Sequence, residues 1–188
     1  MIKYLKKIEV KTLYVLGVKS FKKKLAKDFI LVDKLDLNNP VDVVLASFDT
    51  EVTYDELKIA SLYLQKGSKF LATNMDFRCP IEDGLYIPDC GGICKLLEMA
   101  SDVKPMFLGK PAPEMIYQVE EIFGVKPENC ILVGDRYYTD IMAGINAGID
   151  TLAVLTGETT KEEFESAKIK PKYIRNSIED LLEILNQK

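Results

Sequence analysis

Short apolar runs alternate along the chain with segments whose apolar residues recur at the helical period. The apolar runs predict strands at 12–16, 41–47, 69–73, 105–108, 130–134 and 151–155. The segments with helical spacing predict helices at 21–27, 53–66, 93–100, 112–123, 140–147 and 177–185. Several runs are apolar at nearly every position, which is typical of strands covered by helices on both faces. The alternation therefore predicts an α/β protein with a parallel sheet.

The length of 188 residues fits one medium domain or two small ones. A boundary is predicted near 101–105, where a helical pattern ends and Pro105 forces an extended backbone. The predicted domains are therefore 1–103 and 104–188. The formal net charge of -4 argues against a nucleic-acid partner, which would usually require a basic face.

The absence of histidine restricts the available chemistry more than any other feature of the composition. It excludes Ser-His-Asp and Cys-His nucleophile systems, and it excludes histidine-ligated zinc or iron. Any reaction at this chain must use carboxylates, lysine, hydroxyls, thiols or a hard metal ion.

The four cysteines contain no CxxC pair, so they match neither a thioredoxin-like motif nor a zinc knuckle. They are predicted to be reduced thiols of a cytoplasmic protein, and Cys130, next to a strand, is expected to be buried. The alternative is a thiolate site built from Cys79, Cys90 and Cys94. The basic N-terminus lacks the apolar core of a signal peptide, and no apolar stretch is long enough for a membrane span, so no membrane partner is expected.

Two carboxylates lie in the segment 131–141 (ILVGDRYYTDI). Asp135 directly follows an apolar strand, at the end where parallel sheets bind ligands. Asp140 is five residues further on, in the first turn of a predicted helix. Two carboxylates on one loop suit Mg²⁺, which prefers hard oxygen ligands. The alternative interpretation is a Gly-Asp turn followed by a helix-capping aspartate.

A lysine in the segment 108–113 (LGKPAP) favours the ligand-binding interpretation. Lys110 follows a predicted strand and Gly109, and Pro111 is expected to start a helix. Two neighbouring loops would then bring one cation and two carboxylates to the same crevice, so Lys110 and Asp135 are expected to approach each other. Metal and lysine together neutralise phosphate oxygens, so this arrangement predicts a phosphoryl site.

These segments resemble the third and fourth motifs of the haloacid dehalogenase (HAD) superfamily of phosphatases. LGKPAPEM followed by ILVGDRYYTDIMAGINAG is similar to the subgroup containing para-nitrophenyl phosphatase, phosphoglycolate phosphatase and nucleotide monophosphatase-like enzymes. YVLG, KFLATNMD and IPDCGGICKLL resemble the α/β cap of that subgroup. The resemblance implies an α/β cap at 1–103 and part of a parallel-sheet, Rossmann-like (Rossmannoid) HAD core at 104–188.

The resemblance also implies roles for individual residues. Lys110 would be the catalytic, phosphate-stabilising lysine. Asp135 would be a Mg²⁺ ligand, and Asp140 either a nearby ligand or a carboxylate behind the ligands. The cap loop that carries substrate specificity would be about 76–84, with Asn74 just before it. The implied substrate-binding residues are Asn74, Asp76, Arg78 and Cys79. Arg78 could pair with an anionic group through a bidentate contact, and the alternative is an ordinary surface loop.

The family's nucleophile motif has no counterpart here. Members attack phosphate with the first Asp of a DxDx(T/V) motif, and this sequence contains no Asp-x-Asp at any position. The core is therefore expected to be incomplete, by truncation or by divergence. One substitute is VVLASFDTEVT, in which Asp49, Glu51 and Thr53 form a degenerate motif and Thr73 would bind phosphate. The alternative is a cap loop that leads into a capped helix.

The implied function is Mg²⁺-dependent hydrolysis of a small phosphorylated metabolite through an aspartyl-phosphate intermediate. Without the nucleophile, the chain alone is expected to be a poor phosphatase. The alternative is a non-catalytic relative that binds Mg²⁺ and phosphate, or a partner chain. The strands at 130–134 and 151–155 are expected to flank the missing strand and to leave an exposed core edge, which predicts homo-oligomers.

Overall fold

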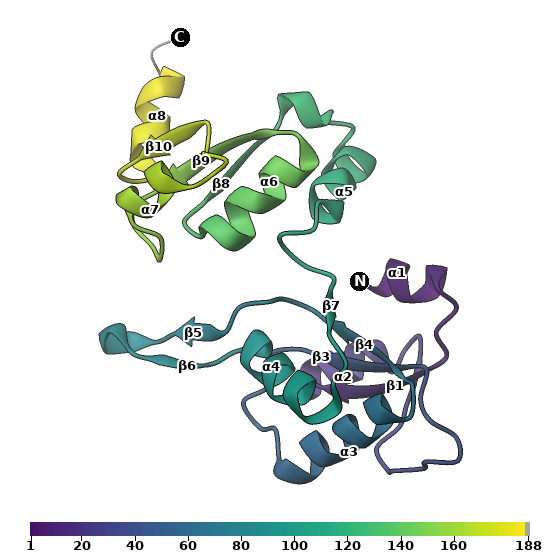
Figure 1. The fold of residues 1–188 in the computed structure, drawn as a ribbon. Helices are drawn as coiled ribbons and strands as arrows, with labels where there is room; N and C mark the ends of the chain where they lie inside the picture. Colours follow the sequence, from purple (N-terminus) through teal and green to yellow (C-terminus); the bar gives the residue numbers. More distant parts are fainter. Residues whose placement is uncertain (187–188) are drawn as a thin grey trace. The chain divides into compact units, whose positions relative to one another are not determined.

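The computed structural model describes residues 1–186 and divides into two compact units, Met1–Gly109 and the chain from Lys110 onward (Figure 1). This division differs from the predicted boundary after residue 103. Strand β7 (Met106–Phe107) pairs in parallel with β4 (Lys69–Ala72), so the segment assigned by prediction to the second domain completes the sheet of the first unit. Pairing of the backbone, rather than the proline at 105, sets the boundary.

The first unit contains a parallel five-stranded sheet in the order β2-β1-β3-β4-β7. Its remaining strands are β1 (Thr12–Leu16), β2 (Ile30–Leu31) and β3 (Val43–Ala46). Leu13 lies opposite Val43, and Val43 lies opposite Lys69. The prediction of parallel strands near 12–16, 41–47 and 69–73 is confirmed. β2 escaped prediction because it has only two residues and lies at an edge of the sheet.

Helices cover both faces of this sheet, which confirms for the first unit the predicted strands with helices on both sides (Figure 1). The helices are α1 (Ile2–Lys7), α2 (Lys19–Leu25), α3 (Tyr54–Gln65) and α4 (Cys90–Ser101). Side chains of β1 alternate between two cores, as the period of a strand requires. Leu13 and Val15 pack with residues of α1 and α2, whereas Tyr14 and Leu16 pack with residues of α3 and α4.

A hairpin interrupts the first unit between β4 and α4. It consists of β5 (Arg78–Pro80), a 3₁₀ turn η1 (Glu82–Gly84) and β6 (Tyr86–Pro88). The hairpin begins within the loop of about 76–84, where the resemblance placed substrate recognition.

The second unit contains a parallel three-stranded sheet in the order β10-β9-β8. Its elements are α5 (Glu114–Phe123), η2 (Pro127–Asn129), β8 (Ile131–Gly134), the π-helical turn η3 (Tyr137–Ile141), α6 (Met142–Ala147), β9 (Asp150–Val154), α7 (Lys161–Ser166), β10 (Tyr173–Arg175) and α8 (Glu179–Asn186). Its small core is centred on Ile141, Ala153 and Phe164.

The expectation that strands 130–134 and 151–155 flank a missing strand is wrong. Strands β8 and β9 pair directly with each other, with Ile131 opposite Asp150 and Gly134 opposite Ala153. Strand β9 already has β10 on its other side. Among the described strands of the second unit, β8 and β10 are therefore the two with an open edge. Within the described residues, no helix has the length and apolar character needed to cross a membrane.

Candidate active site at the carboxyl ends of β8 and β9

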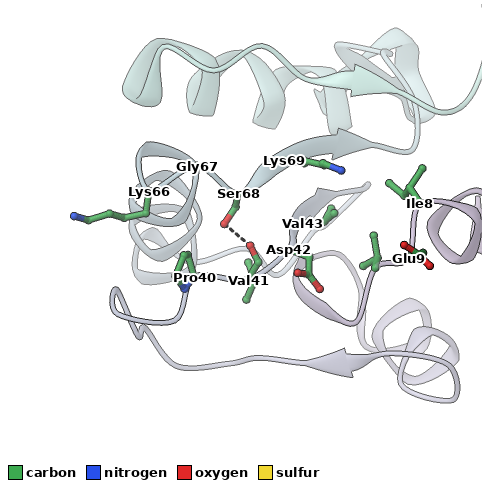
Figure 2. A pocket seen from close by; sticks show the side chains of 11 residues that line it. Ile8, Glu9, Pro40, Val41, Asp42, Val43, Lys66, Gly67, Ser68 and Lys69 are labelled. Carbon is green, nitrogen blue, oxygen red and sulfur yellow. Dashed lines mark hydrogen bonds between the residues drawn. The ribbon is translucent and has the colours of Figure 1, made fainter.

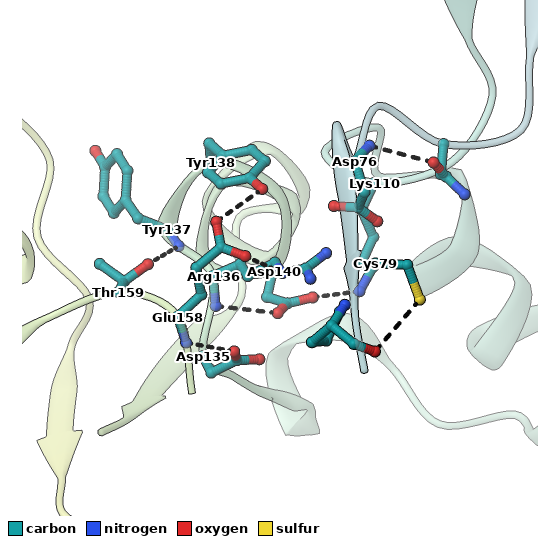
Figure 3. Close-up of polar contacts among 12 residues, drawn as sticks. Asp76, Cys79, Lys110, Asp135, Arg136, Tyr137, Tyr138, Asp140, Glu158 and Thr159 are labelled. Atoms are coloured by element: carbon teal, nitrogen blue, oxygen red, sulfur yellow. Dashed lines mark hydrogen bonds and ion pairs between the residues drawn. The ribbon is translucent and has the colours of Figure 1, made fainter. Parts of the chain in front are cut away.

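In the second unit, Lys110 contacts the loop that follows β8 (Figure 3). The Lys110 Nζ donates to Asp140 Oδ1, and the backbone N–H of Arg136 approaches Asp140 Oδ2 at 3.3 Å. Asn146 of α6 donates to the Pro111 carbonyl at 2.9 Å, which fixes the segment that carries the lysine. The lysine therefore meets the loop that follows β8, but it does so through Asp140. The predicted approach of Lys110 to Asp135 stays a prediction.

Asp140 is held deeper in the unit than a helix-capping aspartate would be. The sequence predicted Asp140 in the first turn of a helix. It lies instead in the wide π-helical turn η3, which precedes α6. Its side chain is 10% exposed, against 39% for Lys110. A Cβ at Gly134 would overlap the Asp140 side chain, so glycine is needed at the end of β8. With both oxygens engaged, Asp140 is better placed to hold Lys110 than to bind a metal.

Asp135 follows β8 directly, as predicted, and is held by the loop after β9. Its Oδ2 accepts a hydrogen bond from the Glu158 backbone N–H at 2.9 Å, and its carbonyl accepts one from the Thr159 N–H at 3.2 Å. A Cβ at Gly157 would overlap Asp135 Oδ2, so the close approach requires glycine there. Among residues 1–186, nothing bonds the second oxygen, Oδ1, which leaves it available as a ligand.

This donor set fits a partly hydrated Mg²⁺ ion. Within residues 1–186, no group of three or more histidine, cysteine or acidic side chains is arranged to hold a metal. Mg²⁺ nevertheless binds to proteins through one or two carboxylates, and waters and substrate phosphates complete its shell. Asp135 Oδ1 is a hard oxygen donor of that kind, and Lys110 carries a positive charge on the neighbouring loop.

The helix predicted from Pro111 begins later than expected. Residues 111–113 form a turn, and α5 starts at Glu114 after Pro113. The helix therefore does not start beside Lys110, so the lysine's own charge, rather than a helix terminus, is the positive group there.

The four predicted substrate-binding residues follow one another along the loop and hairpin after β4. Asn74 Oδ1 accepts a hydrogen bond from the Asp76 N–H at 3.2 Å, which forms a local turn. Arg78 lies 4.3 Å from the centre of the Tyr86 ring on the paired strand. The Cys79 thiol donates to the Pro80 carbonyl. The first unit thus gathers these residues on one projecting segment, and their role in binding substrate stays a prediction.

Asp49, Glu51 and Thr53, the degenerate motif, form the turn that leads into α3. Asp49 Oδ1 accepts a hydrogen bond from the Glu51 N–H at 3.0 Å. Thr53 caps α3 in a reciprocal capping box with Glu56. Thr73 donates to Ser47 Oγ at 3.1 Å. Each group has a local structural partner, which favours the interpretation as a loop leading into a capped helix.

Two hollows of the first unit lie at opposite edges of its sheet. One, of about 290 Å³, lies at the amino ends of the strands, and the Ser68 hydroxyl there donates to the Val41 carbonyl at 2.6 Å (Figure 2). The other, of about 310 Å³, lies at the carboxyl ends of β1 and β3. Ion pairs Lys22–Glu56 and Lys19–Glu51 neutralise charge there, at 3.0 and 3.2 Å.

The cysteines are all unpaired in the structure. Cys90 and Cys94 are buried on α4 with their sulfur atoms 3.9 Å apart. A hydrogen bond from Cys94 lowers the pKa of the Cys90 thiol, and the same bond together with burial raises that of Cys94. The expectation that Cys130 is buried is wrong. It precedes the open-edge strand β8, is partly exposed, and donates to the Lys126 carbonyl.

Sequence reasoning missed Glu158, which contacts the loop of Asp135 through both its backbone and its side chain. The position of Glu158 after a predicted strand could have indicated it. Glu158 follows β9, which pairs in parallel with β8, so its loop lies at the same edge of the sheet as the loop of Asp135. Loops at that edge form the ligand sites of such sheets.

Comparison with known proteins agrees with this fold and site. Residues 107–181 match the HAD-hydrolase-like family model. Over 177 residues the chain is 38% identical to an acid sugar phosphatase of Staphylococcus saprophyticus, with 94% of this chain and 65% of that protein covered. The chain thus spans slightly less than two thirds of that relative.

Solved structures match nearly the whole chain. A 4-nitrophenylphosphatase of Thermotoga maritima is 37% identical with a TM-score of 0.83, covering 97% of this chain and 69% of that one. A thermostable NPPase mutant of Geobacillus stearothermophilus is 36% identical with a TM-score of 0.82, covering 95% of this chain and 69% of that one. This chain belongs to the HAD-like hydrolases, and the predicted fold class is confirmed. The named relatives are phosphatases, which supports a HAD-family phosphatase function.

Proposed function

We propose that the chain supplies part of a Mg²⁺-dependent phosphatase site for small phosphate monoesters, and that Lys110 and Asp135 form the phosphate and metal half of that site. The observation that supports this most directly is the contact of Lys110 with Asp140, which places an ammonium group beside the loop that begins with Asp135. A lysine and a metal-binding carboxylate on neighbouring loops suit phosphoryl transfer, where positioning and charge neutralisation supply most of the catalysis.

Each residue would contribute separately. Lys110 would neutralise a phosphate oxygen, and Asp140 would keep its ammonium group in place. Asp135 Oδ1 would hold Mg²⁺, which would neutralise further phosphate charge. Residues Asn74, Asp76, Arg78 and Cys79 would contact the organic part of the substrate. The first unit would act as the cap, and the second unit as part of the core.

The covalent route that the family uses needs an aspartate that this sequence does not offer in an Asp-x-Asp motif. We therefore propose that the 188 residues alone bind Mg²⁺ and phosphate with negligible turnover. Bound phosphate still requires an aligned attacking group, and the electrostatic half of a site does not replace it. This is the alternative function, a non-catalytic relative, and it shares the same binding site.

Hydrolysis of para-nitrophenyl phosphate in Mg²⁺ separates these possibilities. We expect negligible turnover for the wild-type chain, Lys110→Ala, Asp135→Asn and Asp49→Asn. Robust turnover that Asp49→Asn abolishes would identify Asp49 as the nucleophile and contradict the assignment of its segment to a cap loop. Robust turnover that depends on Asp135 but not on Asp49 would reveal a nucleophile elsewhere in the chain.

A complementation experiment tests the phosphatase proposal itself. The portion of the Thermotoga maritima 4-nitrophenylphosphatase that this chain does not cover is supplied in trans or by fusion. We expect Mg²⁺-dependent turnover to appear, and to be lost in Lys110→Ala and Asp135→Asn. Turnover that survives both substitutions would contradict the assignment of this site.

We also propose a cytoplasmic location, which the unpaired, buried thiols of Cys90 and Cys94 support because such thiols persist in reducing compartments.

A further inference from the structure

The Glu158 side chain bridges two residues of the loop that begins with Asp135 (Figure 3). Its Oε2 lies 3.0 Å from Arg136 Nε, and its Oε1 accepts a hydrogen bond from the Tyr138 hydroxyl at 3.2 Å. The Arg136 and Glu158 side chains are only 16% and 20% exposed. The pair is therefore shielded from solvent more than an ordinary surface ion pair, and its loss should cost more.

Backbone hydrogen bonds connect the same two loops on either side of this bridge. The Glu158 N–H donates to the Asp135 carboxylate, and the Thr159 N–H donates to the Asp135 carbonyl. In the opposite direction, the Tyr137 N–H of the first loop donates to Thr159 Oγ1 of the second at 3.0 Å. One residue thus holds Arg136 and Tyr138 with its side chain, and the Asp135 carboxylate with its own amide.

We propose that Glu158 is a positioning residue that fixes the Asp135 carboxylate for metal binding, an inference that rests on the proposed function. The Glu158 N–H can restrain Asp135 Oδ2 only while the 157–159 loop stays in register with the 135–138 loop. The side-chain bridge to Arg136 and Tyr138 provides that register. With Oδ2 restrained, Oδ1 has one direction in which to meet a cation.

Removing the Glu158 carboxylate should weaken metal binding without removing any metal ligand. The change removes the ion pair of Glu158 with Arg136 and its hydrogen bond with the Tyr138 hydroxyl. Groups that orient a metal ligand typically contribute about 10- to 100-fold in metal affinity. Because Glu158 acts through a backbone amide that the variant retains, we expect the lower end, about tenfold.

The test is a titration of the 188-residue chain with Mn²⁺, a paramagnetic substitute for Mg²⁺, followed by the broadening of amide NMR signals. In the wild type, broadening is expected first at residues 135–140. Glu158→Ala should require about tenfold more Mn²⁺. Glu158→Gln keeps an acceptor for Tyr138, so the Mn²⁺ concentration it requires should lie between those of the wild type and Glu158→Ala. Glu128→Gln, an exposed glutamate of the same unit, is the matched control and should behave as wild type.

The outcomes distinguish this inference from the proposed function. Asp135→Asn should abolish the local broadening. If it does so while Glu158→Ala titrates as wild type, the positioning role of Glu158 is wrong and the metal site stands. If the wild type shows no broadening near residues 135–140, both the metal site and the role of Glu158 are overturned. If Glu158→Ala does not fold, Glu158→Gln is compared with the wild type instead. Equal Mn²⁺ affinities of Glu158→Gln and the wild type would overturn the positioning role of Glu158.

Discussion

Asp140 is the residue on which the position of Lys110 depends. It is buried, and its two oxygens face the lysine ammonium and the Arg136 N–H. A nearly buried carboxylate that loses its cation keeps the desolvation cost and gives up the attraction. The pair therefore matters more to this unit than the exposed ion pair Lys126–Glu128, whose atoms are 3.9 Å apart.

Replacing the lysine should therefore destabilise the fold. We expect Lys110→Met to lower the free energy of unfolding by about 1–3 kcal/mol, the usual cost of a buried polar group left unpaired. The double variant Lys110→Met/Asp140→Asn should recover part of that loss, because it removes the unpaired charge. Urea unfolding followed by circular dichroism provides the measurement. A double variant less stable than the sum of the single changes would contradict a direct pairing.

At the scale of elements, two helices begin with the same reciprocal cap. Thr53 and Glu56 cap α3, and Thr160 and Glu163 cap α7. Burial alone would raise the pKa of Glu56, but the Thr53 N–H and the nearby Lys22 outweigh it and lower the pKa. The Thr160 N–H lowers the pKa of Glu163. Both carboxylates thus prefer the charged form when the protein is folded.

These shifts predict acid sensitivity. A carboxylate with a lowered pKa contributes stability above its unfolded pKa of about 4.3, and this contribution is lost as the pH falls through the folded value. We expect unfolding free energy to be constant near neutral pH and to fall below about pH 4.3. Urea unfolding across that range provides the check. Glu56→Gln should flatten part of the fall, and an unchanged pH dependence in that variant would contradict the prediction.

The elements were predictable where a segment's own pattern determines them. Apolar runs located β1, β3, β4, β7, β8 and β9. The signal is continuous in β1, β3 and β9, because these strands are buried at nearly every position. The short strands β2 and β10, the hairpin β5-β6 and helices α1 and α7 were missed, because pairing or packing rather than composition stabilises them. Lys110, Asp135 and Asp140 were found from motif spacing. Glu158 was not, because its contacts with Arg136 and Tyr138 arise only when β8 and β9 pair.

At the scale of the whole molecule, the second unit combines an open strand edge at β8 with exposed apolar side chains. Ile122 and Phe123 of α5 are 65% and 72% exposed, and Ile131 of β8 is 41% exposed. An unpaired strand edge and exposed apolar side chains each favour association with another chain. We therefore expect the 188-residue chain to form homo-oligomers through this surface.

Sedimentation velocity at several protein concentrations checks this expectation. The wild-type chain should show a concentration-dependent dimer or larger species, and Phe123→Lys should shift it toward the monomer. The matched control is Tyr54→Lys, at an exposed aromatic residue of the first unit. A wild-type chain that stays monomeric at every concentration would contradict an interface at this edge.

The most direct test of the central claim, that Lys110 and Asp135 form the phosphate and metal half of a phosphatase site, is calorimetric titration with inorganic phosphate in the presence and absence of Mg²⁺. The wild-type chain should bind phosphate, more tightly when Mg²⁺ is present. Lys110→Ala should weaken phosphate binding by about tenfold or more, the value of one charged hydrogen bond. Asp135→Asn should remove the dependence on Mg²⁺, while Lys126→Ala, at an exposed lysine of the same unit, should bind as wild type. Phosphate binding that is absent from the wild type, or unchanged in Lys110→Ala, would contradict the account.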